Sequence, residues 1–136
     1  MMKDTGLLLG RVLLGLIFVT SGYGKLMHLD AFAQSLASRG VPMSGPLSVL
    51  GALVEFLGGA AVVLGLQVRW AALLMMLFVI VATAISHRYW EIGEAAARRA
   101  QETQFMKNVA IFGGFLLLMA SGGGRFSLDR LFGKKS

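Results

Sequence analysis

The chain has 136 residues, of which 56% are hydrophobic and only 15% are charged. Soluble globular domains are about 45–50% apolar and about 25% charged, and small domains bury the smallest fraction of their surface. A soluble protein of this length could not hide so much apolar surface. We therefore expect an integral membrane protein that forms a single domain over residues 1–136.

The excess charge is basic, with 13 Lys and Arg residues against 7 Asp and Glu residues and a net charge of +6. These basic residues flank the apolar segments and do not gather into one basic stretch. We therefore expect them to contact membrane lipid and to influence topology, and we expect no nucleic-acid partner. The chain has no cysteine, which excludes a disulfide, a thiolate nucleophile and a zinc or iron–sulfur centre held by sulfur.

Four segments are long and apolar enough to span a membrane, which takes about 20 residues of helix. They are residues 5–27, 46–66, 68–87 and 105–121. The first is too long for the apolar part of a signal peptide and is followed by no small-residue cleavage site, so we expect it to be a span. The short link at Gln67 makes the second and third spans antiparallel. The sequence thus predicts an all-α fold, a bundle of four transmembrane helices with antiparallel neighbours.

The loops predict further short helices on the membrane surface. Apolar residues recur at helical spacing in residues 29–37, and Gly40 and Pro42 end that pattern. Residues 88–104 are rich in Ala, Glu and Arg and are compatible with a helix, with Glu94 and Arg98 in the favourable i,i+4 order. Three glycines at 122–124 end the fourth span, and Ser127 is placed to cap a short helix after it.

Four spans place both termini on one side of the membrane, here called side A, and the first and third loops on side B. Lys and Arg residues divide almost evenly, so the positive-inside rule says little. The basic tail and the acidic residues of the side B loops lead us to expect cytoplasmic termini. Side A carries Lys3, Arg69, Arg125, Arg130, Lys134 and Lys135, and side B carries Lys25, Arg39, Arg88, Arg98, Arg99 and Lys107.

Ionisable residues inside spans are costly and indicate functional sites. Glu55 lies near the middle of the second span. Nearer side B, the other three spans each carry polar residues that share one leaflet: Ser21, Lys25, His87 and Asn108. Lys107 also lies at the start of the fourth span on this side. The sequence therefore predicts a polar pocket that opens to side B above a buried carboxylate.

We take Glu55 and His87 as candidate catalytic residues that move protons, and Ser21, Lys25 and Asn108 as candidate ligand-binding residues. Each also has a purely structural explanation. Lys25, His87 and Lys107 are close enough to span ends to reach water, and Asn108 could join two helices. Arg11, inside the first span, would neutralise Glu55 or form a structural ion pair with Asp129. The glycines within spans are explained by helix packing, and we expect no metal site.

The same residues carry a family resemblance. The first span resembles the R-x-x-L-G-x-x-F-x-x-S-G-x-x-K-L opening of the DoxX family of bacterial inner-membrane proteins. The second span resembles the family's E-x-x-G-G block, and the third ends in a histidine as the family's third span does. The start of the fourth span and the stretch after it resemble the corresponding parts of the family, the latter its G-x-G-x-x-S-L-D ending. The matching positions are Arg11, Leu14, Gly15, Phe18, Ser21, Gly22, Lys25, Leu26, Glu55, Gly58, Gly59, His87, Lys107, Asn108, Gly113, Gly114, Gly122, Gly124, Ser127, Leu128 and Asp129.

The resemblance implies a four-helix protein of the bacterial inner membrane. The family takes its name from a subunit associated with a thiosulfate:quinone oxidoreductase, and other members are linked to thiol or oxidative stress or to quinone detoxification. We therefore expect a membrane subunit of a redox system with a pocket for a quinone or similar lipophilic molecule and no covalent cofactor. If it is an enzyme, it is expected to be a quinone-linked oxidoreductase subunit.

Because the chain lacks cysteine, any redox role would need a bound quinone or a redox partner protein. A homo-oligomer is a further expectation. Two other functions stay open at this point. One is a small proton-coupled transporter that uses Glu55, and the other is a non-catalytic membrane anchor for partner proteins.

Overall fold

The structure is a computed structural model that describes residues 1–134, so Lys135 of the basic tail lies outside the described residues. The described part of the chain is helical and contains no strand. Its elements, in order, are α1 (Met2–Met27), α2 (Leu29–Ser38), α3 (Ser44–Leu64), α4 (Val68–Ser86), the 3-10 helix η1 (Tyr89–Glu91), α5 (Ala95–Ser121) and α6 (Leu128–Leu131).

Four of these helices, α1, α3, α4 and α5, are long and apolar enough to cross a membrane, as predicted. The first three match the predicted spans to within a few residues. The fourth differs, because α5 begins at Ala95, ten residues before the predicted start at Phe105. With 27 residues, α5 is about 40 Å long, whereas the hydrocarbon core of a bilayer is about 30 Å thick.

The early start of α5 has a local cause. The side chain of Glu94 accepts hydrogen bonds from the backbone N–H groups of Ala96 and Ala97, at 2.9 and 2.6 Å, and so caps the first turn. These N–H groups, that of Ala97 first, lower the pKa of Glu94. The alanine-rich stretch that follows favours helix. Glu94 thus acts as a cap, and its expected contact with Arg98 is not among the ion pairs of the described residues.

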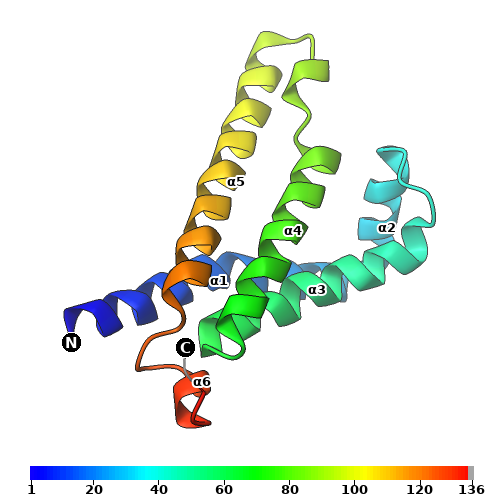
Figure 1. The fold of residues 1–136 in the computed structure, drawn as a ribbon. Helices are drawn as coiled ribbons and strands as arrows, with labels where there is room; N and C mark the ends of the chain where they lie inside the picture. The colour runs from blue at the N-terminus through cyan, green and yellow to red at the C-terminus, as the bar shows by residue number, and fades with distance from the viewer. Residues whose placement is uncertain (135–136) are drawn as a thin grey trace.

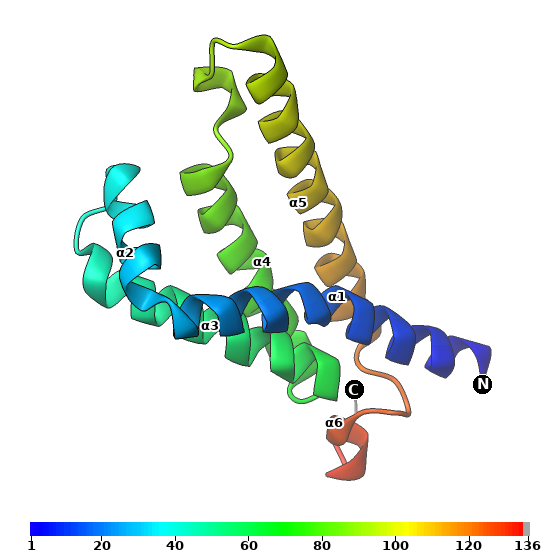
Figure 2. The same ribbon diagram turned by 180° about the vertical axis from the view of Figure 1, so that it is seen from behind.

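The helices form two antiparallel pairs, α1 with α3 and α4 with α5 (Figure 1). The pairs meet near the tight turn between α3 and α4, and they diverge towards the opposite end of the molecule, where α2 and η1 lie (Figure 2). The fork between the two pairs therefore opens on side B. The N-terminus and α6 lie towards the other end, which is side A (Figure 1).

The core fills the region where the two pairs meet. Phe18 of α1 and Phe115 of α5 are in contact, with ring centroids 5.6 Å apart and the ring planes tilted by 43°. Around them lie the other buried apolar side chains of this cluster, which come from α3, α4 and α5: Val62, Val68, Ala71, Ala72, Met75, Met76, Val79 and Leu118.

Helices α1 and α3 approach each other closely through glycines. A Cβ atom added to Gly22 would lie 2.6 Å from the backbone nitrogen of Phe56, and one added to Gly59 would lie 2.8 Å from Cβ of Phe18. Real Cβ atoms do not come so close to backbone. The packing of these two spans thus depends on the missing side chains, as expected for glycines at helix interfaces in membranes.

The two predicted surface helices are present. Helix α2 ends at Ser38, just before Gly40, whose positive φ of 80° suits glycine. At the start of α6, the hydroxyl of Ser127 accepts a hydrogen bond from the backbone N–H of Arg130 at 3.3 Å. Both predictions are confirmed.

We predict that Gly22→Ala will destabilise the folded protein by about 1–3 kcal/mol, because the new methyl group must push α1 away from α3. The measurement is thermal unfolding in detergent, followed by circular dichroism. Gly24→Ala is the matched control, since a Cβ atom there meets nothing within 4 Å. Equal stability of the two variants would contradict the close approach of α1 and α3.

Candidate functional site

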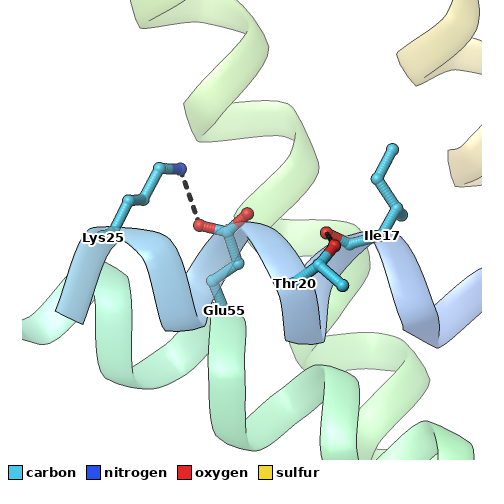
Figure 3. Close-up of polar contacts among 4 residues, drawn as sticks. All are labelled: Ile17, Thr20, Lys25 and Glu55. Carbon is cyan, nitrogen blue, oxygen red and sulfur yellow. Dashed lines mark hydrogen bonds and ion pairs between the residues drawn. The ribbon is translucent and has the colours of Figure 1, made fainter. Parts of the chain in front are cut away.

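The centre of the candidate site is an ion pair between two spans. Nζ of Lys25 on α1 lies 2.6 Å from Oε2 of Glu55 on α3 (Figure 3). The side chain of Glu55 is only 4% exposed, whereas that of Lys25 is 31% exposed. Lys25, and not Arg11, is therefore the partner that compensates the charge of the buried carboxylate.

Aromatic rings also contact the ammonium group of Lys25. It lies 4.8 Å from the centroid of the Phe32 ring on α2 and 5.9 Å from that of Phe78 on α4. Cations are attracted to ring faces at these distances. Lys25 thus joins α1, α3, α2 and α4 in one cluster. The neighbouring hydroxyl of Thr20, also drawn in Figure 3, instead donates to the backbone carbonyl of Ile17 within α1 at 3.1 Å.

A polar cavity of about 170 Å³ lies beside the ion pair, in the fork between the two helix pairs. It is lined by all four spans. All five predicted functional side chains line it: Ser21, Lys25, Glu55, His87 and Asn108. Lys107 and Ser86 line it as well. The structure therefore brings the five residues together around one cavity.

Hydrogen bonds orient two of these side chains. Nδ1 of His87 lies 2.7 Å from Oε1 of Gln101, so the roles of donor and acceptor depend on the tautomer. Nδ2 of Asn108 donates to Oγ1 of Thr83 at 2.8 Å, which ties α5 to α4. Asn108 thus uses one amide hydrogen between helices and still faces the cavity.

Sequence reasoning missed Thr83 and Gln101. Thr83 precedes His87 by four residues, so the two share a face of α4 up to the helix end. Gln101 precedes Asn108 by seven residues, which also places them on one helical face, but this signal is visible only if α5 begins before Gln101. Because the predicted span starts only at Phe105, this relation between Gln101 and Asn108 was not visible in the sequence.

A second cavity, about 300 Å³ in volume and almost wholly apolar, lies among α2, α3 and α4. Its walls include Leu36, Leu50 and Leu77. Four residues line both this apolar cavity and the polar one: Lys25, Phe78, Ala82 and Ser86. The two cavities are thus neighbours, and the ion-paired ammonium group stands at their common wall.

Arg11 and Asp129 lie together at the side A end, but they do not form the expected ion pair. No contact between them within 4.0 Å appears among the ion pairs of residues 1–134. Both oxygens of Asp129 instead accept hydrogen bonds at the start of α4, from the N–H groups of Gln67 at 2.6 Å and Val68 at 2.9 Å. The N-terminal end of a helix, with its unpaired N–H groups and positive dipole, attracts the carboxylate more directly than the guanidinium does.

The guanidinium of Arg11, 1% exposed, donates from Nη2 to the backbone carbonyl of Phe126 in the tail. The backbone N–H of Asp129 in turn donates to the carbonyl of Gly65, in the turn between α3 and α4, at 2.9 Å. The tail therefore folds back and joins α1 to that turn. Arg11 and Asp129 hold this end together and are far from the polar cavity.

The model of the DoxX family matches residues 6–88, which include nearly all of the first three spans and both partners of the ion pair. The chain belongs to the DoxX family. It is 36% identical to the inner membrane protein YqjF of Escherichia coli over 134 residues, covering 98% of this chain and 97% of YqjF. It is also 36% identical to the inner membrane protein YphA of Escherichia coli over 125 residues, covering 91% of this chain and 88% of YphA.

A more distant relative is the uncharacterized membrane protein Rv3486 of Mycobacterium tuberculosis, which is 27% identical over 140 residues, covering 93% of this chain and 80% of Rv3486. No solved structure matches. The chain is thus a membrane protein of the DoxX family, and close relatives of nearly the same length are inner membrane proteins.

We predict that Lys25→Met will destabilise the protein by about 3–5 kcal/mol, because it leaves Glu55 buried without a partner. Glu55→Gln should cost less, since the partly exposed Lys25 can turn towards water. The double variant Lys25→Met/Glu55→Gln should recover most of the loss. Thermal unfolding in detergent measures all three.

Lys107→Met is the control for this series, because exposed Lys107 donates only to Gln104, its neighbour on α5, at 2.6 Å. Additive losses in the double variant would show that Lys25 and Glu55 do not interact.

Proposed function

We propose that this DoxX protein is a membrane subunit of a redox or oxidative-stress system and that it binds a quinone or a similar lipophilic molecule with a polar head. The observation that carries the proposal is the common wall of the two cavities. An apolar cavity of about 300 Å³ meets a polar cavity of about 170 Å³ at Lys25. Ligand sites of this kind are mostly apolar with a few convergent polar groups.

The lining residues suit a carbonyl-bearing head group. Lys25, Asn108 and Ser21 carry N–H or O–H donors at the polar cavity, and carbonyl oxygens accept hydrogen bonds from such groups. An apolar ring or tail would occupy the adjoining cavity, against Leu36 and Leu50 of α2 and α3. Because charge is costly in the membrane, an uncharged head that only accepts hydrogen bonds fits this site better than an ion.

In this proposal, Glu55 and His87 transfer protons. Glu55 is hydrogen-bonded to Lys25, which faces the ligand space, and His87 closes α4 at the side B end. A proton could thus pass between the ligand and water through groups of the chain. A bound quinone would supply the electron chemistry, and a redox partner protein would exchange electrons with it, since the chain has no cysteine.

The transporter alternative is less well supported. A proton-coupled carrier would use a carboxylate that gains and loses its proton alone, and Glu55 is instead paired with Lys25 at 2.6 Å. A bare anchor would have no need of two cavities that share a lysine. We also place the termini in the cytoplasm, so that the fork opens away from it, and we keep a homo-oligomer as a prediction.

We predict that Ala82→Leu will weaken the binding of a short-chain ubiquinone at least about tenfold, because Ala82 lines both cavities and a larger side chain would fill their common wall. Isothermal titration calorimetry of the purified full chain in detergent measures the affinity. The matched control is Ala84→Leu on the same helix, because Ala84 is exposed and lines neither cavity. It should bind as the wild type does.

A second test uses variants of the polar residues. Glu55→Gln and His87→Ala should insert and fold, but they should lose quinone-dependent activity when the protein is reconstituted with a quinone and its redox partner protein. Equal binding by Ala82→Leu and the wild type, or full activity of both polar variants, would refute the proposal. Uptake of a substrate by proteoliposomes that follows an imposed pH gradient would favour the transporter.

A further inference from the structure

A basic cleft lies at the side A end of the protein, remote from the polar cavity. It has a volume of about 400 Å³, and α1, the end of α5, the tail and α6 form its walls. Its charged side chains are three cations and one anion: Lys3, Arg125, Arg130 and Asp4. Nothing in the proposed quinone site uses these residues.

The fold of the tail creates this cleft. Gly124 has a positive φ of 77°, which glycine adopts readily, and the chain turns there to lie against α1. A Cβ atom on Gly124 would meet Leu7 at 3.0 Å and Oδ1 of Asp4 at 3.3 Å. The backbone N–H of Arg125 then donates to Oδ1 of Asp4 at 2.9 Å. This contact holds the tail and its two arginines beside Lys3.

The cations of the cleft are not neutralised by the rest of residues 1–134. The ion pairs of that part are Lys25–Glu55 and Arg88–Glu91. Asp4 lies in the cleft, but its carboxylate contacts the backbone of Arg125 and forms no ion pair there. The three cations are exposed, so the cleft keeps a net positive charge that a ligand can reach.

The position of the cleft favours a lipid over a soluble ion. Lys3 and Asp4 are in the first turn of the membrane-spanning α1, and Ser121 is the last residue of the membrane-spanning α5. The cleft thus lies at the level where head groups are found. Leu7, one turn further along α1, lines its inner wall and continues into the apolar surface of the span.

We propose that this cleft binds the phosphate head group of an anionic phospholipid, with the acyl chains along α1. Lys3, Arg125 and Arg130 would surround the phosphate, and the hydroxyl of Ser121 would stand beside it. Basic pockets next to transmembrane helices recognise anionic head groups by this combination of charge and hydrogen bonding. The inference is independent of the proposed quinone site.

The test is the binding of phosphatidylglycerol and of phosphatidylcholine with the same acyl chains to the purified full chain, counted by native mass spectrometry. The wild type should prefer phosphatidylglycerol. Arg125→Gln/Arg130→Gln should bind it at least about tenfold more weakly, since each charge near the surface contributes to the attraction. Only backbone atoms of these two arginines form the hydrogen bonds that shape the described tail, so the variant should fold.

The matched control is Arg98→Gln/Arg99→Gln, which removes the same charge from exposed positions of α5 outside the cleft. It should bind phosphatidylglycerol as the wild type does. Asp4→Asn keeps an acceptor for the N–H of Arg125 but removes the negative charge, and it should bind phosphatidylglycerol more tightly. Equal losses in both double variants, or displacement of the lipid by millimolar inorganic phosphate, would overturn the proposal.

Discussion

A carboxylate buried within a membrane span needs a partner, and the pairing of Glu55 with Lys25 organises the rest of the structure. The pair joins α3 to α1 at 2.6 Å. The two helices also lie close together near this pair, because glycines one turn away on each helix leave no side chain between them. Gly22 lies beside Phe56, and Gly59 lies beside Phe18. The ion pair and the glycine packing thus support each other.

The two ends of the molecule differ in how their helices are joined. On side A, the tail folds back, and Asp129 and Arg11 satisfy the backbone groups of the α4 start and of the tail. On side B, the helix pairs diverge and leave a polar and an apolar cavity in the space between them. The two adjoining cavities that carry the proposed quinone site therefore belong to the end where the helix pairs diverge.

The candidate site was largely predictable, because ionisable residues are rare in spans and their depth can be counted along a helix. Ser21, Lys25, His87 and Asn108 were expected on one leaflet with Glu55 below them, and all five line one cavity. Their roles in binding or proton transfer stay predictions. Thr83 and Gln101 were missed, since a threonine in a span gives no strong signal and the early start of α5 depends on the cap by Glu94.

The amino-acid sequence by itself determined the class of the protein, the number of spans, the surface helices and the end of the bundle at which the polar residues gather. These follow from local hydropathy and helical periodicity. Only the tertiary structure decided which charges pair. Arg11 was a plausible partner for Glu55 or Asp129. In the structure, Lys25 forms the ion pair with Glu55, and backbone N–H groups at the start of α4 donate hydrogen bonds to Asp129. Pairing depends on how closely helices approach and on which backbone groups lack partners, and both arise from contacts between residues far apart in the chain.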